Sequence, residues 1–375
     1  MTSKNIYIIH RAMFERNGNQ IGFGGIENYI IALARTFQEQ NWNCILVQPS
    51  KDSFQANVDC LTVVGVRTGL LRGNLKKHAL VRWVKQRAEK SNDVIIFATD
   101  SYSVGLNGYN AVAIQHGISW DKPRKSRSKP INFIASLVNQ IKYFSFIKQY
   151  HTLVCVDHNF VNWYRTWADV SINKVHVIYN FYDEKISTDK FNAKWGDSSS
   201  EQINLIIARR FVEYRGITFI APVIQKLLQQ HKNLHVTFAG DGPLKANLDN
   251  MFSNSDRVVI KQYAAKESFN YHSRHHIAVI PTLGSEGTSL SLIEAMAAGC
   301  AVVASNVGGL SNLIIDGFNG HLLIPNQDKF YTTLDMLIKD KTRCKKMALA
   351  GLDTVSFPSS KQHWGEQWVK LIRNM

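Results

Sequence analysis

The sequence contains little cysteine and no long apolar run. Its five cysteines are odd in number, widely separated and form no Cys-x-x-Cys pair: Cys44, Cys60, Cys155, Cys300 and Cys344. Neither a disulfide framework nor a zinc site is expected, and a reducing cytoplasm suits the chain. The apolar run Ile6–Ile9 is too short for a signal peptide, and no stretch reaches the length of a membrane span. We therefore expect a cytoplasmic protein.

Carboxylates are also scarce, because 29 Asp and Glu face 44 Lys and Arg, which leaves a net charge of +15. No Asp-x-Asp pair occurs, so a common carboxylate arrangement for divalent cations is missing. The basic excess suits nucleic acid, an anionic membrane surface or phosphate-bearing substrates, and by itself it does not choose among them. Two basic segments, residues 72–90 and Lys122 to Lys129, lie in the first half of the chain.

Short runs rich in Ile and Val alternate with amphipathic segments of helical length along the whole chain. This pattern is typical of βα units that build parallel sheets, so we predict an α/β fold. A chain of 375 residues exceeds one hydrophobic core, which favours two domains. The predicted strands are Ile6–Ile9, Cys44–Val47, Leu61–Val64, Val94–Ala98, Ala111–Ile114, Leu153–Val156 and Val175–Ile178, then Asn204–Ile207, His235–Ala239, Val258–Ile260, Ala278–Ile280 and Ala301–Val303.

The stretch from Phe181 to Glu201 is polar and includes three consecutive serines, a composition typical of a connector. We predict an N-terminal domain over 1–182, a linker over 183–202 and a C-terminal domain over 203–358. Residues 359–375 carry Trp364 and Trp368 at helical spacing. We expect them to form a helix that packs back on the N-terminal domain.

The most informative stretch is Pro281 to Ala304. A strand ends near Pro281, a Gly/Ser/Thr loop follows and a helix begins near Ser289, so backbone amides and the positive helix end face one space that suits an anion. Glu286 before the helix and Glu294 inside it can accept hydrogen bonds from hydroxyl groups on either side of a bound diphosphate. The alternative is a capped helix whose Glu294 faces solvent.

This stretch resembles the signature of the family-four retaining glycosyltransferases, whose two glutamates are separated by seven residues, as Glu286 and Glu294 are. The continuation through Gly299-Cys-Ala-Val-Val and Gly308-Gly309 is similar too, and the resemblance extends over nearly the whole chain. It implies the GT-B fold of the group 1 type, with two Rossmann-like domains facing each other across a cleft. It also implies that Glu286 contacts the donor sugar and Glu294 the nucleotide ribose, while the diphosphate meets the amides of Gly287, Thr288, Ser289 and Leu290.

Two cations follow the predicted strand Asn204–Ile207 at the carboxyl edge of the sheet, where ligands of α/β proteins bind. Arg210 and Arg215 can neutralise a pyrophosphate leaving group, although a surface pair of arginines is the alternative. The family usually has Lys where Arg215 stands, which keeps the charge but changes the donor geometry. With the helix end, these arginines would replace a metal ion, so no metal or other cofactor is expected beyond the nucleotide sugar. Asp241, in Gly-Asp-Gly-Pro, is expected to be a turn residue.

In the first domain, Gly24 and Gly25 precede a predicted helix over Asn28–Gln40, and their loop brings amides near a phosphate or an acceptor hydroxyl. They resemble the family's first glycine loop. Glu27 suits the start of the helix equally well.

His116, in a His-Gly pair at a strand end, resembles the family's active-site histidine, which touches the donor sugar, whereas a lone histidine is more often structural. Asp100 is a candidate for the acceptor site or a helix cap. In the segment Val177–Asp183, Asn180 resembles a family asparagine that Gly usually follows, and Phe181 departs from that pattern.

The basic segment Lys122 to Lys129 is followed by apolar residues at helical spacing, among them Ile134, Val138 and Ile141. This composition suits a helix on an anionic membrane, peripheral on the cytoplasmic face of the inner membrane, or an ordinary buried helix behind a solvated loop. No recognised nucleic-acid module occurs, so nucleic acid is not expected as a partner.

The predicted function is retaining transfer of a sugar from a nucleotide-diphosphate sugar to a hydroxyl of a glycan or lipid-linked acceptor, in lipopolysaccharide, O-antigen or capsular polysaccharide biosynthesis. One alternative is a nucleotide-sugar epimerase of similar fold, which needs further acid/base carboxylates in the cleft. The other is a non-catalytic sugar-binding subunit, which predicts the loss of charged donor-site residues. Arg210, Arg215, Glu286 and Glu294 are all present, which argues against that subunit.

Overall fold

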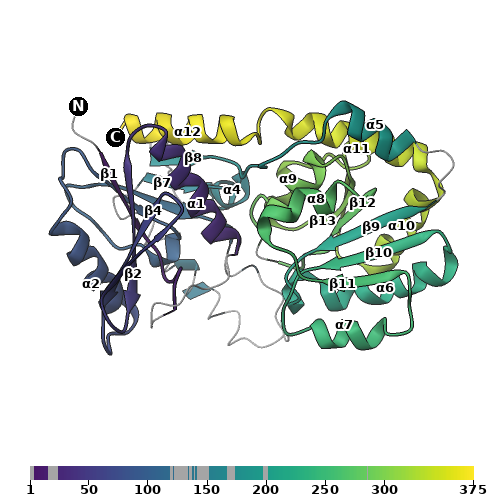
Figure 1. The fold of residues 1–375 in the computed structure, drawn as a ribbon, viewed down its shortest axis with the longest axis horizontal. Coiled ribbons are helices and arrows are strands. Elements are labelled where there is room, and N and C mark those ends of the chain that lie inside the picture. Colours follow the sequence, from purple (N-terminus) through teal and green to yellow (C-terminus); the bar gives the residue numbers. More distant parts are fainter. Residues whose placement is uncertain are drawn as a thin grey trace.

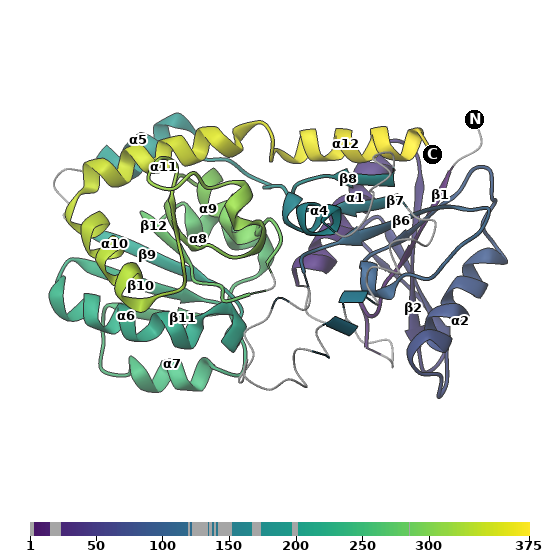
Figure 2. The same cartoon turned by 180° about the vertical axis from the view of Figure 1, so that it is seen from behind.

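The computed structural model describes residues 4–15, 24–118, 121, 134, 137–138, 140–141, 152–166, 174–196, 202–284 and 286–375. Two α/β domains, each built on a largely or fully parallel sheet, stand beside each other, and the last helices run along one side of both (Figures 1 and 2). The predicted α/β fold with two Rossmann-like domains is confirmed.

The N-terminal sheet has eight strands in the order β3-β4-β2-β1-β5-β6-β7-β8. All its neighbouring pairs are parallel except β3 with β4, so the carboxyl ends of the parallel strands meet at one edge. The strands are β1 (Asn5–Ile9), β2 (Asn43–Ser50), β3 (Phe54–Val58), β4 (Leu61–Arg67), β5 (Val94–Phe97), β6 (Asn110–Gln115), β7 (Thr152–Cys155) and β8 (Val175–Val177).

The C-terminal sheet has six parallel strands in the order β11-β10-β9-β12-β13-β14. Strands β9, β10 and β12 are almost wholly buried, as expected for a parallel sheet covered by helices on both faces. The strands are β9 (Ile203–Ala208), β10 (Leu234–Ala239), β11 (Val258–Lys261), β12 (Ile277–Ile280), β13 (Ala301–Ser305) and β14 (His321–Leu323).

Each of the twelve predicted strands is present, and the structure adds β3 and β14. Strand β3 pairs antiparallel at the sheet edge and alternates half-buried with exposed residues, so it lacks the apolar run that identifies a buried strand. Strand β14 has only three residues, which is too short for a periodicity to emerge.

Helices cover both sheets, and most of them bury one apolar face. Within the part of the chain that the structure describes, none combines the length and the hydropathy that crossing a bilayer requires. The helices are α1 (Gly25–Gln38), α2 (Gly73–Lys85), α4 (His158–Arg165), α5 (Thr188–Gly196), α6 (Ile217–Gln230), α7 (Lys245–Met251), α8 (Ser268–His272), α9 (Leu290–Ala297), α10 (Gln327–Lys339), α11 (Lys341–Ser356) and α12 (Lys361–Arg373), with short 3-10 turns at η1 (Asp100–Tyr102), η3 (Glu213–Arg215) and η5 (Gly308–Asn312).

The polar stretch between the two sheets contains a helix, α5, which lies on the C-terminal domain (Figure 1). Phe191 and Trp195 stand four residues apart on one face of α5 and are buried in the C-terminal core. The Ile186 amide also donates to the Ala297 carbonyl at 2.9 Å. Polar composition therefore did not identify this helix, because two aromatic side chains suffice to dock it.

Helix α12 joins the N-terminal core, although the preceding α11 packs against α9 and β13 of the C-terminal domain (Figures 1 and 2). The indole nitrogens of Trp364 and Trp368 donate to the Tyr29 hydroxyl of α1, at 3.3 and 2.9 Å. Phe181 is buried with its ring centroid 4.2 Å from that of Trp364. The departure of Phe181 from the family pattern thus has a structural use, because its ring fills this junction.

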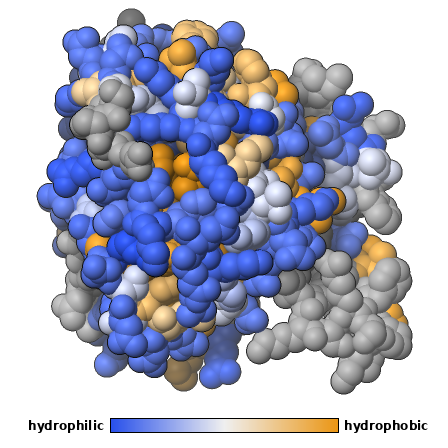
Figure 3. Space-filling model, turned by 90° about the vertical axis from the view of Figure 1, so that its right-hand side faces the viewer, coloured by the Kyte–Doolittle hydropathy of each residue, from blue (hydrophilic) through white to orange (hydrophobic). Residues whose placement is uncertain are grey.

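One end of the molecule can be compared with the predicted membrane segment. The end formed by the C-terminal domain is mostly hydrophilic, with apolar residues in small patches (Figure 3). The predicted membrane segment, Lys122 to Lys129, lies outside the described residues. Of the segment that follows, Ile134, Leu137, Val138 and Ile141 are described, and all four are exposed.

Candidate active site

A cavity of about 730 Å³ lies between the two domains, at the carboxyl edges of both sheets. Residues from both domains line it. They include every residue that the sequence singled out for the site: Gly24, Gly25, Asp100, His116, Arg210, Arg215, Glu286, Gly287, Thr288, Ser289, Leu290 and Glu294. The structure therefore brings together residues that are up to 270 positions apart in the chain.

The C-terminal wall is built on the loop between β12 and α9. Ser289 is the N-cap of α9 in an extended conformation, and Leu290 is the first helical residue. The amides of Leu292 and Ile293 donate to the Ser289 carbonyl at 3.1 Å. Leu290 and Ser291 precede these first helical hydrogen bonds, and both line the cavity. This wall therefore carries hydrogen-bond donors and the positive end of a helix dipole, the arrangement that binds phosphate.

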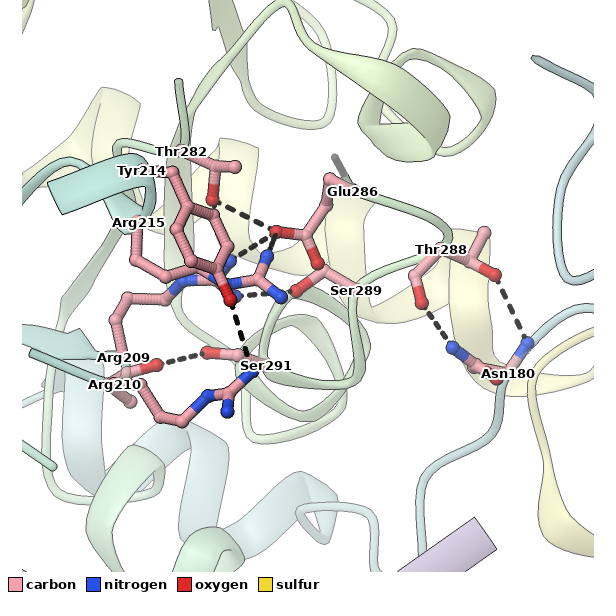
Figure 4. Close-up of polar contacts among 11 residues, drawn as sticks. Asn180, Arg209, Arg210, Tyr214, Arg215, Thr282, Glu286, Thr288, Ser289 and Ser291 are labelled. Atoms are coloured by element: carbon pink, nitrogen blue, oxygen red, sulfur yellow. Dashed lines mark hydrogen bonds and ion pairs between the residues drawn. The ribbon is translucent and has the colours of Figure 1, made fainter. Parts of the chain in front are cut away.

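Glu286 is held by two arginines (Figure 4). Its Oε2 accepts from Arg209 Nη2 and Arg215 Nη1, and Thr282 Oγ1 donates to the same oxygen at 3.0 Å. Only 8% of the Glu286 side chain is exposed. Burial alone raises the pKa of this carboxyl, but Arg209 and Arg215 outweigh it and hold the pKa below the usual value. Glu286 is thus a fixed, ionised acceptor in the cavity wall.

Arg209 is a site residue that the sequence analysis did not select. Its guanidinium is 6% exposed, and beside Glu286 it contacts Thr282 Oγ1 at 2.6 Å and Ser289 Oγ at 3.0 Å (Figure 4). It therefore links the end of β9 to the N-cap of α9. The sequence does show two consecutive arginines, Arg209 and Arg210, directly after a buried strand. Their positions in the sequence alone do not reveal which of the two side chains points inward.

Arg210 points elsewhere. Its guanidinium is exposed and donates to the Tyr214 hydroxyl at 3.2 Å, at the rim of the same cavity (Figure 4). Arg210 has no carboxylate partner among the described residues, so its charge is available to an anionic ligand there. Adjacent arginines therefore occupy different environments, one neutralised by Glu286 and one facing the cavity mouth.

Glu294 lies one turn into α9 and lines the same cavity as Glu286. Its Oε2 accepts from Ser268 Oγ at 2.7 Å. Burial raises the pKa of Glu294 to about 7. Unlike Glu286, Glu294 forms no ion pair with a described Lys or Arg that would keep it ionised, so its charge changes in the neutral range.

The N-terminal wall brings the start of α1 to the same cavity. Helix α1 begins three residues earlier than predicted, with Gly24 as N-cap and Gly25 inside the first turn. Glu27 accepts from the Gly24 amide at 2.9 Å and contacts His10 Nε2 at 3.1 Å, so it stabilises the helix start. A β-carbon on Gly25 would lie 3.5 Å from Leu290 Cδ1, which shows that the N-termini of α1 and α9 face each other closely.

His116 closes the N-terminal wall after β6. Its Nε2 donates to the Ala98 carbonyl at 2.9 Å, and its ring meets Tyr29 edge-on with centroids 5.2 Å apart. Burial lowers the pKa of His116 to about 4, so the imidazole is neutral and Nδ1 carries the lone pair. Gly287 permits the close approach of the two domains here, because a β-carbon on it would lie 2.8 Å from the His116 carbonyl oxygen.

Asp100 begins η1, with Thr99 as the preceding N-cap, and it lines the cavity on the N-terminal side. Its Oδ1 accepts from the Ser101 amide at 2.7 Å. Burial raises the pKa of Asp100 to about 7.

Asn180 links the two walls. Its amide nitrogen Nδ2 donates to the Thr288 carbonyl, and its backbone N–H donates to Thr288 Oγ1 at 3.3 Å (Figure 4). Thr288 Oγ1 in turn donates to the Val156 carbonyl after β7. The Thr288 hydroxyl therefore forms hydrogen bonds between the domains, and of Thr288 only the backbone can bind a ligand.

Asp241 is exposed between Gly240 and Gly242 at the cavity rim. A β-carbon on Gly240 would lie 2.0 Å from the Arg209 carbonyl oxygen, so this turn must pass close to the strand end that carries Arg209. Among the described residues, no cluster of three or more His, Cys, Asp and Glu side chains has the arrangement of a metal site.

Two family models match the chain. Residues 202–340 match the model of the group 1 glycosyl transferases, and residues 23–185 match the model of glycosyltransferase family 4. The two matches fall on the two sheet domains, one on each.

Relatives with curated names align with part of the chain. The phosphatidylinositol N-acetylglucosaminyltransferase gpi3 subunit of Schizosaccharomyces pombe is 24% identical over 192 residues, covering 50% of this chain and 41% of that protein. The lipopolysaccharide 1,2-N-acetylglucosaminetransferase of Salmonella typhimurium is 28% identical over 171 residues, covering 39% and 44%. The chain thus spans less than half the length of these relatives.

Solved structures align over almost the full chain. Sucrose-phosphate synthase from Thermosynechococcus elongatus superposes with a TM-score of 0.75 at 14% identity, covering 99% of this chain and 98% of that one. Anabaena HepE in complex with UDP-glucose superposes with a TM-score of 0.72 at 16% identity, covering 99% and 100%. At such identities the likeness concerns the fold, and it extends to both domains.

Proposed function

Because the chain belongs to the glycosyltransferases of group 1 and family 4, we propose that it transfers a sugar, with retention, from a nucleoside-diphosphate sugar to an acceptor hydroxyl. One observation carries the proposal. The N-terminus of α9 is flanked by an ionised Glu286 and by Glu294, inside a cavity that both domains line. That arrangement offers separate positions for a sugar, a diphosphate and a nucleoside.

The donor lies along the C-terminal wall. The amides of Gly287 to Leu290 bind the diphosphate at the helix end, and Arg210 and Arg215 supply positive charge beside it. Glu294 accepts from the ribose hydroxyls. The presence of UDP-glucose in the HepE structure supports a nucleotide-sugar donor for this fold.

In the reaction, the bond between the anomeric carbon and the diphosphate oxygen breaks while the acceptor oxygen bonds to the same face of the sugar. The acceptor hydroxyl proton passes to the departing phosphate. Arg210, Arg215 and the α9 amides stabilise the negative charge that develops on that leaving group, so no metal ion is required. Ionised Glu286 and the Nδ1 lone pair of neutral His116 accept hydrogen bonds from the sugar hydroxyls and hold the sugar in position.

The acceptor is a glycan or a lipid-linked sugar bound by the N-terminal domain, and Asp100 is the residue that receives its hydroxyl. Assembly of lipopolysaccharide, O-antigen or capsular polysaccharide is the proposed setting, supported by relatives named for lipopolysaccharide and for amylovoran biosynthesis. A cytoplasmic location, peripheral to the inner membrane through Lys122 to Lys129 and the next helix, completes the proposal. The exposed Ile134, Leu137, Val138 and Ile141 support it.

Nucleotide binding tests the donor site directly. Thermal unfolding is measured with UDP, GDP, TDP and CMP, and with their common sugars, for the wild type and for Glu294→Ala. We expect one nucleotide to raise the unfolding temperature of the wild type and to have little effect on the variant. Exposed Glu39 provides the control Glu39→Ala, which should respond as the wild type does. Folded wild-type protein that responds to none of them would contradict the proposal.

Turnover is tested separately. With the selected nucleotide sugar, Glu286→Gln should reduce sugar transfer or donor hydrolysis by at least about 100-fold, the scale of removing a group aligned for the transition state. Proton NMR of the anomeric signal distinguishes retention from inversion. Formation of an epimerised nucleotide sugar in the absence of any acceptor would instead support an epimerase.

A further inference from the structure

A second cavity, of about 470 Å³, lies behind η1 in the N-terminal domain. Its lining comes from the carboxyl ends of four parallel strands or the turns after them: Arg11 after β1, Pro49 in β2, Gly73 after β4 and Tyr102 after β5. Ligands of parallel α/β sheets bind at this edge. The donor site described above does not include this cavity.

The cavity is positively charged. Arg11, Lys76 and Lys77 line it, and among the described residues of the lining Glu15 is the one carboxylate. Within the described part of the chain, neither Arg11 nor Lys76 forms an ion pair with a carboxylate. Lys77 is oriented by the Ser101 carbonyl at 2.7 Å and by the Tyr102 ring at 5.6 Å. Three cations that share a cavity with a single described carboxylate favour an anion in the space between them.

The N-terminus of helix α2 adds to the positive potential of the cavity, because its first residue, Gly73, lies in the cavity wall. The first turn of α2 carries no acidic residue, and its basic residues at the other end, Arg82 and Lys85, are turns away. Three cations and a helix N-terminus against one carboxylate suit a phosphate, which carries nearly two negative charges at neutral pH, better than a single carboxylate.

The two cavities share η1. Asp100 and Ser101 line the donor cavity, and Tyr102 lines the second one, while Lys77 bonds to Ser101 between them. A molecule anchored by a phosphate beside Lys76 therefore reaches the donor cavity by passing over a single turn of chain. Its hydroxyl then arrives at Asp100, across from the donor wall.

We propose that the second cavity binds a phosphate group of the acceptor, and that the acceptor is a phosphorylated sugar or lipid. That the bound molecule is the acceptor rests on the proposed glycosyltransferase function. That the cavity binds phosphate rests on Arg11, Lys76, Lys77 and the start of α2. The donor diphosphate has its own cations and helix end in the C-terminal domain, so this second anion site is left for the other substrate.

Two sources of the phosphate are distinguishable. Leu70 and Leu75 beside the cavity are 97% and 65% exposed, on the turn and helix that also carry Gly73 and Lys76. Large apolar side chains so exposed are suited to the hydrocarbon chain of a lipid phosphate. A soluble sugar phosphate would use the cations and leave these leucines in water.

The experiment measures phosphate binding in two arms. In the first, sn-glycerol 3-phosphate is titrated calorimetrically into the wild type, the double variant Arg11→Ala/Lys76→Ala and the control Arg82→Ala. In the second, the same proteins are floated with phosphatidylcholine vesicles that contain or lack phosphatidic acid. Arg82 is exposed on α2 outside the cavity, so the control removes a similar charge from the same helix. Unfolding temperatures confirm that each variant is folded.

We expect the double variant to bind at least about 10-fold more weakly in one or both arms, because each lost charge-assisted hydrogen bond accounts for roughly that factor. The control should match the wild type. Loss in the first arm alone assigns a soluble phosphate, and loss in the vesicle arm assigns a lipid headgroup. No binding of either probe to the wild type, or equal losses in Arg82→Ala, would overturn the inference. Nucleotide binding, measured on the same samples, separates this outcome from failure of the donor proposal.

Discussion

The two domains handle positive charge in opposite ways. On the C-terminal side, Arg209 and Arg215 are buried against Glu286, and hydroxyl groups satisfy part of the remaining hydrogen bonding. On the N-terminal side, Arg11 and Lys76 line a cavity in which Glu15 is the one described carboxylate. A neutralised cluster keeps its geometry without a ligand, whereas uncompensated cations attract one. We infer that the wall proposed to bind the donor is prearranged, and that the cavity proposed to bind the acceptor is completed by its ligand.

The starts of the two helices that face the cleft carry different side-chain contacts. At α1, Glu27 accepts from the amide of the N-cap Gly24 and also contacts His10 Nε2. At α9, the hydroxyl of the N-cap Ser289 accepts from Arg209 and makes no cap hydrogen bond to the helix. The start of α1 therefore has a carboxylate beside it and that of α9 a cation, which favours α9 as the helix end that binds an anion.

The largest expected effect comes from two neighbouring arginines. Arg209→Met removes a buried cation from Glu286, so we expect about 2–4 kcal/mol of destabilisation and a fall in kcat of about 100-fold. The pKa of Glu286, now held low, should rise, which moves the acid limb of the pH–rate profile to higher pH. Arg210→Met removes an exposed cation and should raise the donor KM while the unfolding temperature stays the same.

Unfolding scans and initial rates between pH 5 and 9 test this pair of variants. The pH profile separates a positioning role from a merely structural one, since a loss of folded protein lowers the rate equally at every pH. We propose that Arg209 orients Glu286 and that Arg210 binds the donor instead. This proposal would be wrong if the two variants had equal unfolding temperatures, or if the acid limb of the pH–rate profile did not move in Arg209→Met.

The next effect concerns pH and the donor. Since burial raises the pKa of Glu294 to about 7, this carboxyl is mostly protonated at pH 6 and mostly ionised at pH 8. Ribose hydroxyls donate to the ionised form, so the donor should bind about 10-fold more tightly at pH 8 than at pH 6. Calorimetric titration of the nucleotide at pH 6 and pH 8 measures this difference in affinity, and Glu294→Gln should abolish it.

Asp100 provides the control, because burial raises its pKa to about 7 as well. Asp100→Asn should leave the pH dependence of nucleotide binding in place, since Asp100 lies on the acceptor side. If the pH dependence of nucleotide binding disappeared in Asp100→Asn and persisted in Glu294→Gln, then Asp100 rather than Glu294 would be the carboxyl that binds the donor.

The smallest expected effect tests how the two sides are joined. Thr288→Val removes the hydroxyl that bonds to Val156 and Asn180 while keeping the shape of the side chain. Leaving these buried groups unpaired should cost about 1–3 kcal/mol and lower the unfolding temperature. Ser311→Ala, at an exposed position of η5, is the control and should have little effect. No destabilisation in Thr288→Val would mean that this contact does not couple the domains.

Much of this architecture was predictable, because the information is local. Buried parallel strands show as short runs of Ile and Val, and the twelve predicted strands are present for that reason. The edge strand β3 was missed, since it is exposed on alternate residues and pairs antiparallel. Helix α5 was missed because its docking depends on Phe191 and Trp195 meeting a core formed by residues far away in the chain.

Part of the lining of the cavity between the domains was also identified from sequence, because strand ends, glycine loops and charges at those ends must meet at one edge of a parallel sheet. The ion pair between Glu286 and Arg209 was not identified from sequence. Arg209 and Arg210 are equivalent by composition and position, and only the path of the chain after β9 points one toward Glu286 and the other toward solvent.

The sequence by itself determined the α/β class, the two sheets and the set of residues at their carboxyl edges, since these follow from the burial pattern of neighbouring residues. The tertiary structure decided which arginine orients Glu286, that Thr288 joins the domains, and that Arg11 meets Lys76 and Lys77 in one cavity. Those contacts join groups tens to more than a hundred residues apart. Their distances depend on how whole elements pack, and no local pattern encodes that packing.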